Sequence, residues 1–169
     1  VRLACELQDR LVRGTPSEDY QTGAVRETQV LIGPYAGCSI EESTYVPPPP
    51  GKDLVAALGA WEKWLHESQC HEIVKVALGH YQFEALHPFT DGNGRIGRLL
   101  AILQLIHAEL LPGPLINLSP HFEQRSEEYR HRLRAVSTEG AIDAWVQFFC
   151  DALTSQAKEA QSRIRALLT

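Results

Sequence analysis

The stretch HPFTDGNGRIGR, from His87 to Arg98, joins two apolar segments, and it decides how the rest of the chain is interpreted. Its glycines allow the backbone to turn with positive φ, so that successive N–H groups can surround an anion. Arg95 and Arg98 are three residues apart and share one face of the helix that follows, where guanidinium groups can bind phosphate oxygens. The stretch therefore predicts a phosphate-binding loop that opens a helix. It is not a P-loop, because it lacks GKS or GKT.

Two side chains of this loop extend the prediction from binding to chemistry. Asp91 is a candidate ligand for Mg²⁺, which proteins bind through one or two carboxylates together with phosphate oxygens. His87 is a candidate general base, because an imidazole can accept the proton of an incoming hydroxyl. Phe89 is predicted to point inward and anchor the loop. DGNG alone is a common turn and a histidine before proline is usually structural, so only the complete spacing favours nucleotidyl or phosphoryl transfer.

Hydrophobic spacing predicts a mainly α chain with one small β-hairpin. Strands are expected over 28–33 and 43–46, and Pro47–Pro50 is interpreted as a rigid connector rather than an SH3-type ligand. Ser119 and Pro120 are expected to be the N-cap and the first residue of a helix. The expected helices cover 2–13 (ended by Gly14 and Pro16), the segment from Lys52 with Leu54, Leu58, Trp61 and Leu65 on one face, 73–86, 95–110, 119 to Gly140, and a last helix containing Ile142, Trp145, Phe148, Phe149 and Leu153.

The histidines outside the loop are interpreted as structural. His80, Glu84 and His87 have a spacing of i, i+4 and i+7 that zinc sites also use. A buried, hydrogen-bonded His80 is the preferred interpretation. The histidines expected at the surface or at helix ends are His66, His71, His107, His121 and His131.

Composition limits the class of protein. The chain has 169 residues, of which 44% are hydrophobic and 22% charged, which predicts one globular domain. The net charge of −5 favours neither nucleic acid nor an anionic membrane surface. Four cysteines without a CxxC pattern indicate a reduced, cytoplasmic protein, and no apolar run is long enough to span a membrane. The start at Val1 and the absence of Met predict that the chain is a fragment.

The stretch from His87 to Arg98 resembles the signature of the Fic family, HxFx(D/E)GNGRxxR, at every defined position. The resemblance continues through most of the chain and implies a Fic-type helical bundle over 1–169 with a β-hairpin flap. Segments similar to the flap are VRETQVLIG (25–33) and TYVPPPP (44–50). Segments similar to bacterial Fic proteins that often carry a winged-helix domain downstream are HYQFEALHPF (80–89), LINLSPHFEQRSEEY (115–129) and WVQFF (145–149).

The resemblance implies a protein adenylyltransferase that moves AMP from ATP to a Ser, Thr or Tyr hydroxyl of a target protein. Relatives often have Asn before Arg125 and a second aromatic residue after Tyr129, where this chain has Gln124 and Arg130. The implied roles are His87 as base, Asp91 as ligand of Mg²⁺ or Mn²⁺, Gly92, Asn93 and Gly94 as anion hole, Arg95 on phosphate, Arg98 on the terminal phosphate, Tyr129 in the adenine pocket, and Gln29, Val30, Leu31, Ile32 and Gly33 as the flap that binds the target.

Two subfamily features refine this expectation. Gly94 stands where Doc-type kinases carry Lys, which argues against phosphorylation. The inhibitory pattern [ST]xxxE[GN] of many Fic proteins is absent, so an inhibitory helix is expected outside this chain. Removal of AMP by the same site and a non-catalytic nucleotide- or protein-binding module stay as alternatives. The expected partners are ATP, a target protein or the chain itself, and a second copy in a homodimer, with no nucleic-acid or membrane partner.

Overall fold

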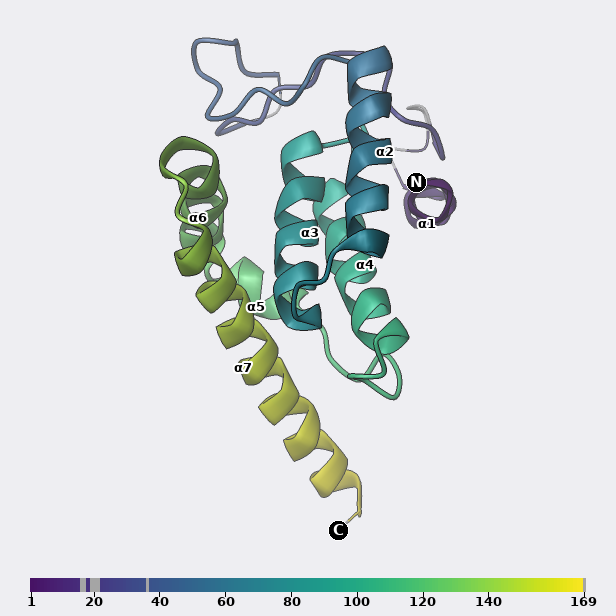
Figure 1. The fold of residues 1–169 in the computed structure, drawn as a ribbon, viewed down its shortest axis with the longest axis vertical. Coiled ribbons are helices and arrows are strands. Elements are labelled where there is room, and N and C mark those ends of the chain that lie inside the picture. The colour runs from purple at the N-terminus through teal and green to yellow at the C-terminus, as the bar shows by residue number, and fades with distance from the viewer. Residues whose placement is uncertain (16–17, 19–21, 36, 169) are drawn as a thin grey trace. The chain divides into compact units, whose positions relative to one another are not determined.

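The chain is mainly helical, as predicted. The computed structural model describes residues 1–169 except 16–17, 19–21, 36 and 169, so Pro16 lies outside the described residues. Where the structure is described, the helices are α1 (Arg2–Val12), α2 (Lys52–Glu67), α3 (Glu72–Leu86), α4 (Asn93–His107), α5 (Ser119–Gln124), α6 (Ser126–Glu139) and α7 (Ile142–Leu168) (Figure 1).

The chain divides into two compact units. The first comprises Val1–Ser68 and Tyr81–Gly97, and the second comprises Gln69–His80 and Arg98–Thr169, so α3 and α4 each contribute to both. The core of the first unit contains the predicted α2 face. Its members Leu54, Leu58 and Trp61 are buried, whereas Leu65 is only partly covered. The rings of Trp61 and Phe83 lie with their centroids 5.5 Å apart, which joins α2 to the end of α3.

The predicted hairpin is reduced to a single antiparallel bridge between Ile32 and Tyr45. The described residues contain no β-strand beyond this bridge. The amide of Ile32 donates to the Tyr45 carbonyl at 3.0 Å, and the amide of Tyr45 donates to the Ile32 carbonyl at 3.1 Å. Pairing cannot extend along Pro47–Pro50, because proline has no amide hydrogen to donate to a neighbouring strand. Strand pairing in the described part of the flap is therefore confined to the Ile32–Tyr45 bridge, and side-chain hydrogen bonds make the other connections.

The second unit differs from prediction between Ser119 and Gly140. One helix was expected there, but α5 and α6 are separated at Arg125, whose φ is −118° and ψ is 36°. With this break, the rings of Phe122 and Tyr129 stack at a centroid distance of 4.7 Å. The N-cap of α5 is Leu118 rather than Ser119, which is the first helical residue. Gly140 ends α6 in the left-handed conformation, with φ of 69°, as a C-cap glycine does.

Aromatic side chains and one histidine form the core of the second unit. His80 is 2% exposed, and its Nε2 lies 2.9 Å from the Tyr129 hydroxyl, which confirms that it is buried and hydrogen-bonded. The His80 ring also stacks on Trp145, whose indole N–H donates to the Ala77 carbonyl at 2.8 Å. Trp145 itself is fully buried.

His121 lies in the last turn of α5, in agreement with the helix-end prediction, but it is not a surface residue, because it is only 6% exposed. Its ring meets those of Phe122 and Phe148 edge-on, each with centroids 6.0 Å apart. Burial, with the charge of Arg125, lowers the pKa of His121 below its ordinary value. The other four histidines interpreted as superficial are exposed, namely His66, His71, His107 and His131.

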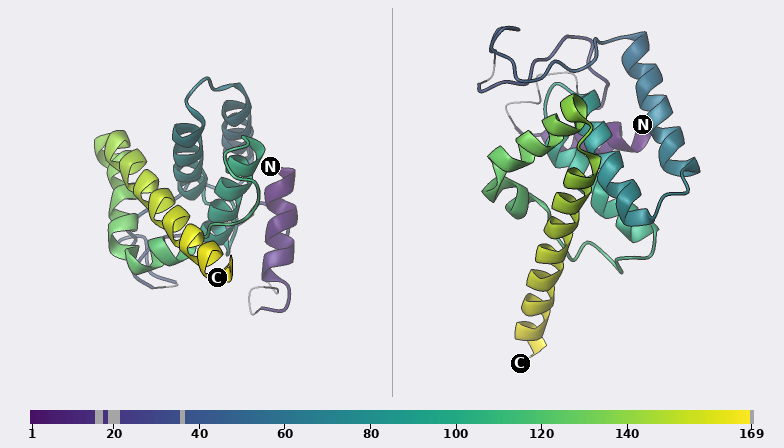
Figure 2. Two further views of the ribbon diagram at one scale, coloured as in Figure 1. Left: turned by 90° about the horizontal axis from the view of Figure 1, so that it is seen from below. Right: turned by 60° about the vertical axis from the view of Figure 1, so that its left-hand side comes forward.

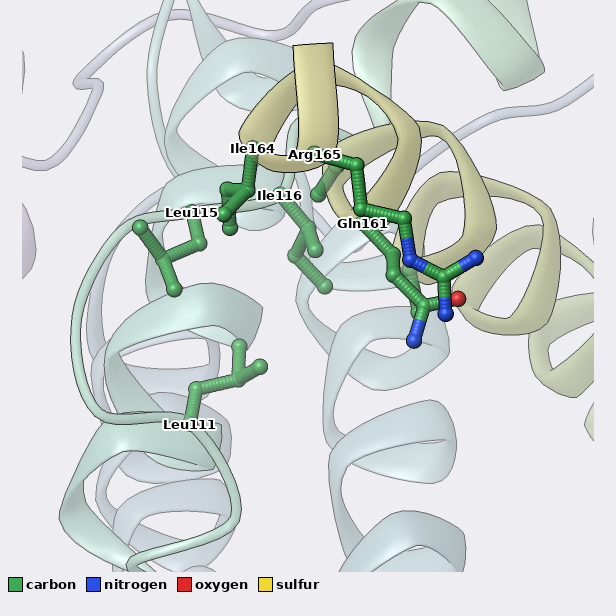
Figure 3. Close-up of a pocket in the computed structure, with 8 residues that line it drawn as sticks. Leu111, Leu115, Ile116, Gln161, Ile164 and Arg165 are labelled. Atoms are coloured by element: carbon green, nitrogen blue, oxygen red, sulfur yellow. The ribbon is translucent and has the colours of Figure 1, made fainter. Parts of the chain in front are cut away.

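The helix α7 runs past α5 and α6, and its C-terminal turns reach beyond both (Figure 2). Near its end, Ile164 and Arg165 line a pocket of about 360 Å³ together with Leu111, Leu115 and Ile116, and the Arg165 side chain extends alongside Gln161 (Figure 3). Among the described helices, none combines the length and apolar character that a membrane span requires. Cys5, Cys38 and Cys150 are free thiols.

Candidate functional site

The loop between α3 and α4 is held by a reciprocal amide pair. The amide oxygen of Asn93 accepts from the backbone N–H of Phe89 at 2.9 Å, and its amide nitrogen donates to the Phe89 carbonyl at 2.8 Å. Asn93 is 2% exposed and Phe89 is 1% exposed, so both bonds are shielded from water. Phe89 packs on Phe83 with ring centroids 6.2 Å apart, which confirms the predicted inward anchor. The Asn93 side chain thus shapes the loop from inside.

Residues of α1 also contact the loop between α3 and α4. The buried Gln8 donates to the Asp91 carbonyl at 3.4 Å and accepts from the Gly23 amide at 2.6 Å. Gly92 has φ of +87°, and a β-carbon built on it would lie 3.2 Å from Cδ2 of Leu11. Both the backbone conformation and the close approach of α1 therefore favour glycine at position 92.

His87 is held so that one ring nitrogen is available for proton transfer. Its Nδ1 lies 3.3 Å from the Glu84 carbonyl, which can only accept, so Nδ1 carries the hydrogen and Nε2 carries the lone pair. Burial lowers the pKa of His87 to about 4; the charge of Arg26 also lowers it, while the Glu84 hydrogen bond and Asp91 raise it. The imidazole is consequently neutral near pH 7, the form that accepts a proton.

Asp91 and Arg95 form an ion pair at the mouth of the loop, with Oδ2 of Asp91 3.0 Å from Nη2 of Arg95. The two side chains are 45% and 44% exposed, so the pair is weak, about 0.3–0.5 kcal/mol, and can open for a ligand. No group of three or more metal-ligating side chains occurs in the described part of the chain. A half-exposed carboxylate beside the predicted phosphate-binding loop still fits Mg²⁺, which can take its other ligands from phosphate and water.

The loop runs directly into the N-terminus of α4. The helix begins at Asn93, and the Ile96 amide donates to the Gly92 carbonyl at 2.9 Å. The first amides of a helix lack intrahelical acceptors and carry the positive end of the helix dipole, which attracts anions. Because the Asn93 side chain is engaged with Phe89, its contribution to an anion hole would come from its backbone amide, together with that of Gly94.

Two further predicted residues, Arg98 and Tyr129, belong to the second unit. Nε of Arg98 donates to the Ser119 hydroxyl at 2.8 Å, and Nη2 lies 3.9 Å from the carboxylate of Glu123. The Arg98 side chain is 14% exposed and that of Glu123 is 70% exposed, so the arginine is largely buried and its acidic partner lies in solvent. Tyr129 lies against Phe122 with its hydroxyl on His80. Their roles toward nucleotide stay predictions.

The predicted flap residues lie beside the bridge. Nε2 of Gln29 donates to the Pro47 carbonyl at 3.0 Å, which joins the two sides of the flap. A β-carbon on Gly33 would lie 2.3 Å from Sγ of Cys38, so this position accepts only glycine without movement. Val30, Leu31 and Ile32 complete the segment and are partly exposed. The Tyr45 hydroxyl donates to the Ala85 carbonyl at 2.9 Å, which fixes the flap to α3.

The sequence interpretation missed one residue of the site, Arg26. It is 1% exposed, and its side chain donates to three backbone carbonyls, including that of His87. No pattern marks it, because a single arginine between Val25 and Glu27 ahead of an expected strand has the appearance of a surface charge. Its only sequence sign is its place within the flap-like segment 25–33.

The protein is helical, and the loop that contains His87 leads into the core helix α4. The adjacent flap carries one antiparallel bridge, between Ile32 and Tyr45. The sequence model of the Fic/DOC family matches residues 1–105, and the chain belongs to this family. It is 36% identical over 132 residues to "Protein adenylyltransferase Fic" of Drosophila ananassae, covering 76% of this chain and 23% of that protein. The corresponding protein of Drosophila melanogaster is 35% identical over the same length and coverage.

Solved structures agree with this assignment. A Fic family protein from Desulfovibrio desulfuricans G20 superposes with a TM-score of 0.77 at 28% identity, over 95% of this chain and 46% of that one. Fic-1 from C. elegans gives a TM-score of 0.66 at 26% identity, over 98% of this chain and 43% of that one. The chain therefore spans about a quarter of the length of the Drosophila relatives and under half of these solved chains.

Proposed function

We propose that the chain is the catalytic part of a protein adenylyltransferase, which transfers AMP from ATP to a hydroxyl side chain of a target protein. The observation that carries the proposal is His87, a neutral imidazole with its lone pair on Nε2, in the loop that leads into the N-terminus of α4. The relatives from Drosophila that bear the name protein adenylyltransferase support the same chemistry.

In this reaction, the target hydroxyl oxygen attacks the α-phosphorus of ATP. The bond between that phosphorus and the bridging oxygen of pyrophosphate breaks, and the hydroxyl proton passes to Nε2 of His87. The backbone amides at the start of α4 and the Arg95 guanidinium bind the phosphate oxygens, on which negative charge is concentrated. Asp91 would hold Mg²⁺ or Mn²⁺, which supplies charge neutralisation of the phosphates.

The remaining predicted residues also have roles in the proposal. Arg98 binds the terminal phosphate, and Tyr129 contributes to the adenine pocket. The flap from Gln29 to Gly33 binds an extended target segment by adding it as a strand, since backbone groups of an unpaired edge can bond another chain. The target is another protein or the chain itself, and a second copy in a homodimer is a further partner of the proposed enzyme.

Two preparations of labelled ATP distinguish the reactions open to this site. Incubation of the chain with Mg²⁺ and cell lysate should transfer label from ATP carrying ³²P at the α-phosphate and none from ATP carrying it at the γ-phosphate. His87→Ala should reduce transfer by about 10²–10⁴-fold while ATP binding is retained, because the base acts on the hydroxyl. Label from the γ-phosphate would instead establish phosphorylation.

The remaining alternatives also have distinct outcomes in this assay. Loss of label from a protein that was AMP-modified beforehand would establish removal of AMP by the same site. Saturable ATP binding without transfer or removal would show a nucleotide-binding module. Transfer by His87→Ala at the wild-type rate would refute the role of the imidazole.

A further inference from the structure

Arg26 is a buried cation without a carboxylate partner among the residues that the structure describes. Burial lowers the pKa of its guanidinium, but arginine stays protonated in proteins. Removing such a charge from water costs several kcal/mol unless hydrogen bonds replace the lost hydration. A buried cation is therefore weak evidence for stability, and a role in positioning other groups has to be considered.

All three nitrogens of the guanidinium donate to backbone carbonyls. Nε donates to the carbonyl of His87 at 2.8 Å, Nη1 to that of Thr28 at 3.0 Å, and Nη2 to that of Pro48. The backbone amide of Arg26 donates to the Pro88 carbonyl at 2.9 Å. Because the guanidinium is planar and rigid, these bonds fix the carbonyl groups relative to one another.

The three carbonyls belong to functionally different segments. Thr28 immediately precedes the flap residues, and Pro48 follows Tyr45, the residue on the returning side of the bridge. His87 carries the imidazole, and its φ of 47° lies in the left-handed region. That conformation costs a residue with a side chain about 1–2 kcal/mol, so surrounding contacts must hold it in place. The Arg26 hydrogen bond to the His87 carbonyl is one such contact.

We propose that Arg26 is a positioning residue that fixes the backbone of His87 to both sides of the flap, so that the bound target segment and the base keep one relative placement. This inference rests on the proposed adenylyl transfer for its kinetic consequence and on the three hydrogen bonds for its structural one. Lysine cannot replace the residue fully, because a single ammonium group cannot span three carbonyls in one plane.

Kinetics test the consequence for transfer. In self-labelling with α-labelled ATP and Mg²⁺, Arg26→Ala should lower the rate by about 10²-fold, because small misplacements of reacting groups have effects of that size. The dissociation constant of ATP should change less than threefold. Millimolar guanidinium chloride should restore part of the rate by entering the vacated space, whereas equal sodium chloride should not. Arg2→Met is the matched control, since Arg2 is 94% exposed, and its rate should be unchanged.

A second measurement does not depend on turnover and covers an Arg26→Ala variant that fails to fold. Arg26→Lys keeps the charge, and its NMR spectra should show displaced ring nitrogen signals of His87 and a displaced amide signal of Ile32 together, while Arg2→Met shows neither change. A folded Arg26→Lys with both signals in place, or with the wild-type transfer rate, would overturn the inference. Absence of transfer by the wild-type chain would refute the proposed function alone and leave the NMR test intact.

Discussion

The two hydrogen bonds between the Asn93 side chain and the Phe89 backbone predict a measurable contribution to the free energy of unfolding. Asn93→Ala removes two hydrogen bonds, at 2.9 and 2.8 Å, and leaves the N–H and C=O of Phe89 buried without these partners. An orphaned buried polar group costs about 1–3 kcal/mol. Alanine returns about 0.5 kcal/mol through its higher helix propensity. For the two groups together, the free energy of unfolding should fall by about 1.5–5.5 kcal/mol, and the midpoint temperature by about 3–20 °C.

Urea unfolding followed by far-UV circular dichroism measures this change. The chain offers a matched control in Asn117, an exposed asparagine whose Oδ1 accepts one hydrogen bond from the Ser119 amide at 3.0 Å. Asn117→Ala should change the free energy of unfolding by no more than about 0.5 kcal/mol. If Asn93→Ala costs no more than this control, the amide pair does not hold the loop and the reasoning is refuted.

An isosteric replacement separates the two hydrogen bonds. Asn93→Asp keeps an acceptor for the Phe89 N–H but places a carboxylate oxygen opposite the Phe89 carbonyl, where a donor is needed. The buried charge raises the pKa of the introduced carboxyl group. The loss of stability relative to the wild-type chain should therefore be largest near neutral pH and should shrink as the pH falls and the group becomes protonated, as urea midpoints of both proteins measured across the pH range would show.

Three further predictions concern the charged groups of the site. NMR titration should show His87 neutral at pH 6 and titrating near pH 4, and a titration midpoint at pH 6.5 would contradict this. Because the pKa in the folded state is lowered from 6.5 to about 4, the contribution of about 3 kcal/mol to stability is fully present above pH 6.5 and is lost as the pH falls toward 4. Asp91→Asn should weaken Mg²⁺-dependent ATP binding and be partly rescued by excess Mg²⁺; equal wild-type affinity for ATP with and without EDTA would refute the metal assignment. Arg98→Ala should lower AMP transfer by about 10²-fold with unchanged helix content, and a wild-type rate would exclude a role for Arg98 in placing the triphosphate.

Helices with strong apolar spacing were predictable because one residue pattern determines both the helix and its buried face. The α2 face of Leu54, Leu58 and Trp61 is an example. One failure has a local cause, and another depends on a partner that is distant in the sequence. The flap segments have the composition of strands, but Pro47–Pro50 removes the donors that pairing needs. His121 lies in a short polar segment, and its burial depends on Phe148, which comes from a different helix.

The candidate loop was predictable to the extent that its residues act locally. The inward Phe89 and the helix start beside Gly94 follow from neighbouring sequence. The amide pair of Asn93 was not predictable from composition, because asparagine also suits an exposed turn. Arg26 was missed since its hydrogen bonds reach residues up to 61 positions away. Burial of an arginine by backbone carbonyls leaves no local pattern.

The tryptophans provide built-in optical probes of how the two units come apart. Trp61 and Trp64 belong to the first unit, whereas Trp145 is the single tryptophan of the second and stacks on the His80 ring. In a Trp145→Phe variant, tryptophan fluorescence would come from the first unit alone. Subtracting this signal from that of the wild-type chain would give the emission of Trp145, which reports on the second unit. Coincident denaturation curves from the two signals would mean that the chain unfolds in one cooperative transition. Separate curves would mean that the two parts of the continuous helices α3 and α4 unfold independently.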